Sequence, residues 1–143
     1  MKKFYLMITI ISLIAYLSGE CEGFNWYHNI DTSDCDTGDI SALQHFVINS
    51  GDSLEMDMDV NSNGEVDILE LGWQLWEDGR LIHWICQEVP SPYYFYEYDC
   101  GLSGEIPKEI GNLDALVKLR LQNNKLSGQI PATICNLNNI NSG

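Results

Sequence analysis

Hydrophobic and polar positions repeat with a fixed period near the C-terminus of the chain. The segment LSGEIP at residues 102–107 returns as LSGQIP at residues 126–131, an offset of 24 residues. Within the repeat, Leu119 and Leu121 alternate with polar residues, which predicts a short strand with one apolar side. Asn124 follows this strand, where its amide can satisfy backbone groups as the chain turns away. This spacing is typical of stacked repeats, because no single repeat can bury its apolar row alone.

The pattern resembles the plant-type leucine-rich repeat. The matching residues are Leu116, Leu119, Leu121, Asn124, Leu126, Ser127, Gly128, Ile130 and Pro131. The resemblance implies an α/β fold, a leucine-rich-repeat solenoid start of about one and a half 24-residue repeats with a helical N-terminal cap. We assign the cap to residues 20–80 and the repeats to residues 81–143. A third repeat begins at Leu137 and stops at Gly143, so we expect the chain to be truncated at its C-terminus.

A helix is predicted upstream, over residues 39–47. Asp39 is expected to cap its start and Gly51 to end it. The residues that fall on its apolar face are Ile40, Leu43, Phe46 and Val47. This segment resembles the short helix that opens the N-terminal cap of plant-type leucine-rich-repeat proteins. Such a cap shields the apolar edge of the first repeat from water.

The first strand is predicted over residues 81–86, where the cap segment ends. Trp73, Trp76 and Trp84 are large enough to cover the edge of the first repeat, and we expect most of them in the core. Alternatively, His83 and Trp84 lie exposed on a binding face.

Residues 1–19 have the pattern of a signal peptide: two lysines, an apolar run and small residues before a cleavage site. The run is too short to span a bilayer comfortably. We therefore expect a secreted or cell-surface protein with no membrane insertion after signal removal. Cys21 raises the alternative of a lipoprotein anchor. Glu20 argues against it, because a small residue normally precedes the lipid-modified cysteine.

Export changes the interpretation of the five cysteines, since an oxidising compartment favours disulfides. The simplest local pairs are Cys21 with Cys35 and Cys86 with Cys100, which leave Cys135 over. Spacing does not fix the connectivity. In the repeat alignment Cys100 also takes the place of Asn124, a position where leucine-rich repeats accept either residue.

The formal net charge is −14, and the acidic residues are unevenly distributed. Residues 20–79 contain fifteen Asp or Glu and no Lys or Arg. Such a block repels nucleic acid and anionic membranes, so we expect neither as a partner. It either attracts cations or forms a solvated surface.

Residues 59–70, DVNSNGEVDILE, fit the twelve-residue calcium loop of the EF-hand at its constrained places. Gly64 stands sixth, where the chain turns sharply, and Val66 is expected to tie the loop to its support. The predicted Ca²⁺ ligands are Asp59, Asn61, Asn63, Glu65 through its carbonyl, Asp67 and Glu70. These are all oxygen donors, which suit a hard cation.

The surroundings of the loop differ from those of an EF-hand or of a dockerin module, which carries a similar loop in two copies. The preceding helix is broken, and Gly72 weakens the helix that would leave the loop. We therefore expect a calcium loop set inside a cap. The alternative is an acidic turn that binds no metal.

The concave face of the repeats is the predicted ligand-binding surface. Shifting residues 93–100 by 24 places aligns Tyr94, Tyr96 and Tyr98 with three polar residues of the later repeat. Those partners are Lys118, Arg120 and Gln122. Tyrosines beside cations suit a sugar, a peptide or an acidic ligand, so we expect a protein or carbohydrate partner. The alternative is that Lys118 and Arg120 only keep the strand surface solvated. The register turns Glu97 inward, which is unfavourable for an unpaired carboxylate.

No nucleophile–base pair and no phosphate-binding glycine motif occurs, so we expect no catalytic residues. The predicted function is an exported, non-enzymatic recognition module with a structural calcium site. Two alternatives are a dockerin-like calcium-dependent assembly module and the N-terminal part of a larger secreted enzyme.

Overall fold

The computed structural model describes residue 21, residues 32–87 and residues 100–140. In this part of the chain the strands are β1 (Trp73–Glu77), β2 (Arg80–Ile85), β3 (Ser103–Glu105), β4 (Lys118–Arg120) and β5 (Lys125–Ser127). They follow one α-helix, α2 (Thr37–Ser50). The short 3₁₀ helices are η1 (Gly51–Ser53), η2 (Met56–Met58), η3 (Ile68–Glu70), η4 (Lys108–Asn112) and η5 (Ala132–Asn136). The predicted mixture of helix and strand is confirmed.

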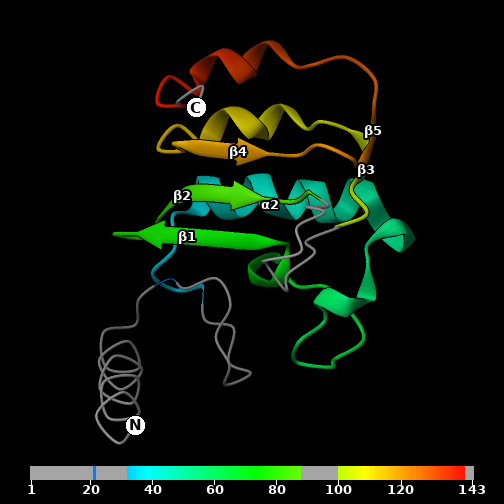
Figure 1. Ribbon diagram of the computed structural model, residues 1–143. Helices are drawn as coiled ribbons and strands as arrows, with labels where there is room; N and C mark the ends of the chain where they lie inside the picture. Colours follow the sequence, from blue (N-terminus) through cyan, green and yellow to red (C-terminus); the bar gives the residue numbers. More distant parts are fainter. Residues whose placement is uncertain (1–20, 22–31, 88–99, 141–143) are drawn as a thin grey trace, which may run out of the picture.

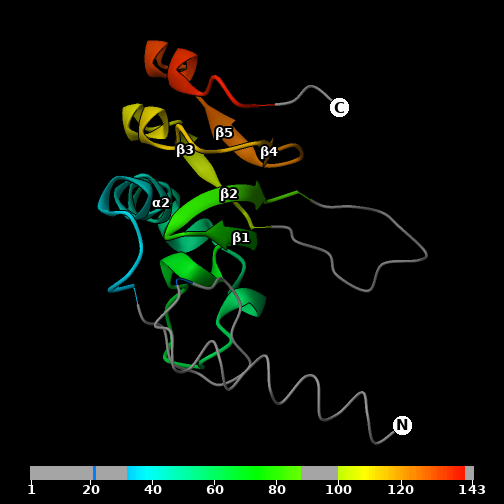
Figure 2. The same ribbon diagram turned by 90° about the vertical axis from the view of Figure 1, so that its left-hand side faces the viewer.

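The helical segments and the strands form two sides of the molecule. Helix α2 contacts η4, and η4 contacts η5, so the three lie one above the next along one side (Figure 1). Figure 2 shows the strands on the other side of this stack. Strand β2 pairs in parallel with β4, and β3 pairs in parallel with β5. Parallel pairing of segments far apart in the sequence is what stacked repeats require.

Strand β2 confirms the first strand expected over residues 81–86, but an antiparallel hairpin precedes it. Strand β1 covers the free edge of β2, so the described sheet has the order β1-β2-β4. Asp78 and Gly79 form the turn, with φ of 51° and 76°. A two-residue loop with positive φ at both places is favoured by Asp-Gly, because its twist matches that of the flanking strands.

Helix α2 begins two residues earlier than expected, and its capping residue differs. Asp36 is the N-cap: its Oδ1 accepts hydrogen bonds from the backbone N–H groups of Gly38 (2.9 Å) and Asp39 (3.1 Å). The assignment of Asp39 as the cap is therefore wrong. Its carboxylate is fully buried and binds Arg80 instead. Gly51 ends the helix, as expected, with φ of 49°.

One hydrophobic core joins the cap to the repeats. The ring of Trp84 packs edge-on against Phe46 of α2, with 4.8 Å between centroids. The predicted apolar face of α2 is confirmed, since Leu43 and Phe46 are buried and Ile40 and Val47 are partly buried against the core. The repeat contributes buried Leu102, Ile110, Leu113 and Leu116. Trp76 is also buried, so two of the three tryptophans lie in the core as expected.

Both simple disulfide pairs are present, Cys21–Cys35 and Cys86–Cys100. Cys135 is free and exposed. Disulfides are typical of an oxidising environment. No helix among the described residues is long and apolar enough to cross a membrane.

Candidate functional site

The acidic loop, residues 59–70, follows η2 and ends with η3 at the edge of the cap. Val66 and Leu69 are buried, so the loop is anchored by apolar contacts as expected for Val66. Gly64 has φ of 93°, a conformation that strains residues with a side chain. No α-helix enters or leaves the loop in the described residues, because α2 ends at Ser50 and η3 is a single turn. The expectation of a loop set inside a cap agrees with these flanks.

Four of the predicted ligand side chains converge inside the loop. The Asp59 carboxylate accepts hydrogen bonds from the backbone N–H of Asn63 (3.1 Å) and Gly64 (2.9 Å). The amide groups of Asn61 and Asn63 both donate to Asp67 Oδ2, at 2.8 Å and 2.9 Å. The side-chain carbonyls of Asn61 and Asn63 accept from backbone N–H groups two residues further on. These contacts fold the loop around its own oxygen atoms.

Glu70 closes the loop through hydrogen bonds to backbone N–H groups. Its Oε1 accepts from Val60 and Asn61, each at 3.0 Å, and its Oε2 accepts from Asp67 at 3.0 Å. Within the described ranges, no group of three or more His, Cys, Asp and Glu side chains is placed to hold a metal ion.

The donor chemistry of the loop fits calcium. Among the described residues, the charges of Asp59, Asp67 and Glu70 are met only by N–H donors. A calcium ion takes six to eight oxygen ligands and would replace the amide N–H groups that now point at Asp67. The side chains of Asn61 and Asn63 would then turn their carbonyl oxygens toward the ion, and Glu65 would offer its backbone carbonyl.

A second candidate site is the open face of the β1-β2-β4 sheet. Residues directly opposite one another in paired strands lie on the same face. The pairs Trp73–Ile85 and Leu75–His83 continue into Arg120 and Lys118 of β4. The inward face carries the buried Gln74, Leu81 and Trp84 instead. We call Trp73, Leu75, His83, Ile85, Lys118 and Arg120, all half-buried, the open sheet face.

The open sheet face combines aromatic and basic groups. The rings of Trp73 and His83 lie 6.0 Å apart between centroids, tilted by 36°. Neither Lys118 nor Arg120 forms an ion pair with a carboxylate in the part of the chain that the structure describes. Gln122 is exposed just beyond β4. Two cations beside two rings form a surface that suits acidic groups.

The neighbours of Lys118 and Arg120 differ from those expected. The 24-residue alignment predicts Tyr94 and Tyr96 beside them, but β2 occupies that place with His83 and Ile85. The alignment fails there because the segment closed by the Cys86–Cys100 disulfide lengthens the first repeat. Tyr94, Tyr96, Tyr98 and Glu97 lie outside the described residues, as does the predicted signal peptide.

The repeat alignment holds at Asn124, whose amide bonds to the backbone as expected. Its Nδ2 donates to the carbonyls of Cys86, Leu121 and Gln122, and its Oδ1 accepts from the N–H of Leu102 at 2.8 Å. One side chain thus satisfies backbone groups from three successive segments.

Arg80 forms salt bridges with Asp39 and Asp114, which we call the Arg80 joint and which the sequence analysis missed. Its guanidinium donates to Asp39 Oδ2 (3.0 Å) and Oδ1 (3.2 Å), and also pairs with Asp114 Oδ1 at 2.5 Å. The hydrogen bonds that Arg80 donates to Asp39 and Asp114 raise the pKa of Arg80 above its usual range. Arg80 is the first cation after Lys3, and this isolation within an acidic block is the signal that could have revealed it.

The comparisons with known proteins agree with the repeat. The family model described as Leucine Rich Repeat matches residues 115–137. These residues include β4, Asn124 and β5. No curated protein and no solved structure matches the chain. The match supports a leucine-rich-repeat protein, and repeats of this kind suggest a protein-interaction module.

Proposed function

We propose that the protein is an exported, non-enzymatic recognition module, a leucine-rich-repeat solenoid stacked on a calcium-stabilised cap. Its ligand is an acidic segment of another protein, bound on the open sheet face. The observation that carries this proposal is the position of Lys118 and Arg120. In a chain with a net charge of −14, these two cations lie together without carboxylate partners in the described part. A neutral carbohydrate is a weaker candidate, because it would not use their charge.

The binding test compares one double charge removal with one single charge removal. The probe is a twelve-residue peptide of alternating Glu and Tyr, titrated by fluorescence anisotropy, with a Gln-Tyr peptide as the neutral reference. We expect the Lys118→Gln/Arg120→Gln variant to bind the acidic peptide at least tenfold more weakly. Lys125→Gln is the matched control, because Lys125 is an exposed lysine of the other sheet. Equal loss in the control, or equal binding of both peptides by the parent, would contradict the proposal.

The calcium site is proposed to stabilise the cap. The oxygen-only loop, its buried anchor Val66 and the convergence of Asp59 and Asp67 support this. Few charged ligands favour a weak extracellular site with a Kd of about 10⁻⁴–10⁻³ M. At about 10 mM calcium, binding only to the folded state then adds about 1.4–2.7 kcal/mol to the free energy of unfolding.

Thermal unfolding with chelator and with added calcium measures this stabilisation. We expect calcium to raise the midpoint of the parent and of Asp57→Asn, which removes an exposed carboxylate outside the ligand set. Glu70→Gln should lose the calcium-dependent shift, whatever its stability without calcium. The calcium site is refuted if calcium does not raise the thermal midpoint of the parent. If magnesium raises the midpoint equally, charge screening explains the result and the site is likewise refuted.

A further inference from the structure

A hollow beside the acidic loop lies on a different part of the molecule from the open sheet face. It has a volume of about 390 Å³ and lies between the C-terminal end of α2, the segment that follows it, and the acidic loop. This volume is at the lower end of the range of about 300–1,000 Å³ for ligand pockets, which is room for one or two side chains. The lining residues are Val47, Gly51, Asp52, Leu54, Met56, Gly64, Glu65 and Val66.

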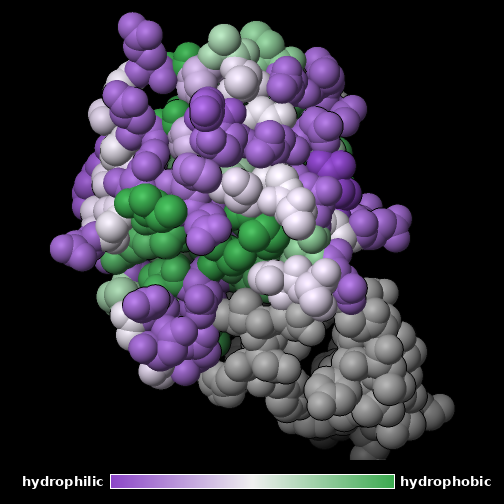
Figure 3. Space-filling view, turned by 180° about the vertical axis from the view of Figure 1, so that it is seen from behind, coloured by the Kyte–Doolittle hydropathy of each residue, from purple (hydrophilic) through white to green (hydrophobic). Residues whose placement is uncertain are grey.

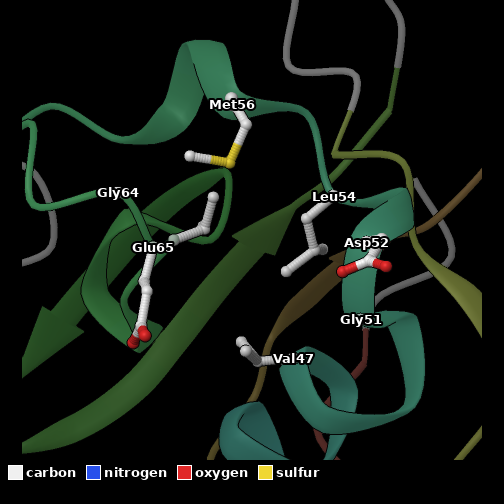
Figure 4. Close-up of a pocket in the computed structure, with 8 residues that line it drawn as sticks. Val47, Gly51, Asp52, Leu54, Met56, Gly64 and Glu65 are labelled. Atoms are coloured by element: carbon white, nitrogen blue, oxygen red, sulfur yellow. The ribbon is translucent and has the colours of Figure 1, made fainter.

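The floor of the hollow is apolar. Figure 4 shows Val47 of α2, and Leu54 and Met56 of the segment that follows it, directed toward the same space, while the carboxylate of Glu65 extends away from them. Val47 and Leu54 also pack against the core, so their positions are fixed from behind. Met56 is 52% exposed, and the neighbouring Ile48 of α2 is 64% exposed. A methionine with this freedom adapts readily to an apolar guest.

The hydrophobic surface of this side of the molecule is concentrated rather than scattered. Figure 3 shows hydrophobic side chains gathered at the level of α2 and below it, under an upper half that is mostly hydrophilic. Contiguous apolar patches on a soluble protein mark interaction sites more often than isolated apolar residues do.

The rim of the hollow carries only negative charge. Asp52 and Glu65 line it, and the neighbouring Glu55 and Asp57 are exposed. None of these four carboxylates forms an ion pair in the described part of the chain, and residues 20–79 contain no Lys or Arg. The potential at the hollow is therefore negative and favours a positively charged guest.

The negative charge of the rim decides which of the possible binding partners the hollow favours. A second copy of the chain would bring its own acidic rim against this one, and like charges at close range oppose association. A segment rich in Lys and Arg would neutralise the rim while its apolar side chain filled the hollow. We propose that this hollow binds a basic segment of a partner protein, anchored by a bulky apolar side chain against Leu54 and Met56.

The test uses three peptides of equal length. The first repeats Leu-Lys-Lys-Leu three times, the second replaces every Leu with Ser, and the third replaces every Lys with Glu. Affinity is measured by fluorescence anisotropy in 50 mM and 200 mM NaCl, and the methyl signal of Met56 is followed by NMR. We expect the Leu/Lys peptide to bind at least tenfold more tightly than either reference, to weaken at the higher salt concentration, and to shift the Met56 signal.

Two variants locate the site. Met56→Gln removes the exposed apolar wall and should weaken the Leu/Lys peptide at least fivefold. Ile130→Gln is the matched control, because it changes an exposed apolar residue in the repeat and should bind like the parent. Since both side chains are exposed, unchanged thermal midpoints will show that both variants fold.

Three outcomes would overturn the proposal. Equal affinity for the Ser/Lys peptide would mean charge attraction without an apolar anchor. Parent-like binding by Met56→Gln would place the peptide elsewhere. A concentration-dependent dimer in ultracentrifugation that Met56→Gln abolishes would make a second copy the occupant.

Discussion

Replacing Arg80 with methionine tests the joint between the cap helix and the repeat. Asp39 has no exposed surface, and its carboxylate accepts two hydrogen bonds from Arg80 and one from the N–H of Leu81 at 2.9 Å. Without Arg80, a buried charge would keep only the Leu81 donor. Removing one partner of a buried ion pair costs about 3–5 kcal/mol, because the remaining charge is uncompensated.

Urea unfolding followed by tryptophan fluorescence measures this cost, since Trp84 is buried against Phe46. At a slope of about 2 kcal/mol per M, a loss of 3–5 kcal/mol lowers the midpoint by about 1.5–2.5 M. The double variant Asp39→Asn/Arg80→Met should recover about 2 kcal/mol of this loss. It buries no charge, and the Asn carbonyl still accepts from Leu81.

Two exposed pairs provide the controls. Asp114 is 61% exposed although it pairs with the same guanidinium, so Asp114→Asn should cost about 1 kcal/mol or less. The side chain of Lys108 is 81% exposed, and its Nζ lies 4.0 Å from Glu109 Oε1. Lys108→Met should change the free energy of unfolding by no more than about 0.5 kcal/mol. The reasoning is refuted if Arg80→Met costs no more than these two, or if the double variant is less stable than Arg80→Met alone.

Two further predictions concern backbone positions in the described residues. Asn124→Ala should lower the free energy of unfolding, measured by urea titration, by about 2–4 kcal/mol. The substitution leaves the Leu102 N–H and the Cys86 carbonyl without their hydrogen-bond partner. A loss under about 1 kcal/mol would show that water replaces the amide. Gly72→Ala should destabilise the protein far more than Gly51→Ala, although both glycines have positive φ. A Cβ at residue 72 would lie 2.5 Å from the Ile85 carbonyl oxygen, whereas a Cβ at residue 51 would have no atom within 4 Å. Similar thermal midpoints for the two glycine variants would contradict the steric reason.

The sequence was most informative where a residue pattern repeats or a local rule applies. Leu119 and Leu121 face the core side of β4, and Asn124 turns the chain, because the 24-residue period requires equivalent contacts in each repeat. The helix end at Gly51 and the turn at Gly64 follow from backbone conformations that glycine adopts without strain.

Contacts between distant segments could not be predicted from the sequence. Asp36 and Asp39 are both good N-cap residues by type, and only the position of Arg80, 41 residues away, decides which of them is buried. Strand β1 was not predicted, although Asp78-Gly79 between two apolar segments is a strong hairpin signal. Most of the three tryptophans were expected in the core, and Trp73 is the exception, since it lies half-buried on the open sheet face beside His83.

Polar residues that interrupt the helix pattern also hold the cap to the repeat. Ser53 Oγ donates to the Gly101 carbonyl at 2.8 Å, Ser50 Oγ accepts from the N–H of Ser103 at 3.1 Å, and Asn49 Nδ2 donates to the Glu105 carbonyl at 2.8 Å. The Arg80 joint lies near the other end of α2, so polar contacts secure both ends of the helix. Apolar packing of Phe46 fills the space between them.

The acidic loop, in contrast, is connected to the sheet through its exit. Gln74 Nε2 donates to the carbonyls of Ile68 and Leu71, and Trp84 Nε1 donates to Leu71 at 2.8 Å. Gln74 and Trp84 are inward residues of β1 and β2, each next to a residue of the open sheet face. An ion that held Glu70 in place would therefore steady these two strands through η3, without touching the ligand. If calcium and the acidic ligand bind as proposed, their binding should therefore show weak positive coupling, and replacing the buried Gln74 side chain should remove that coupling.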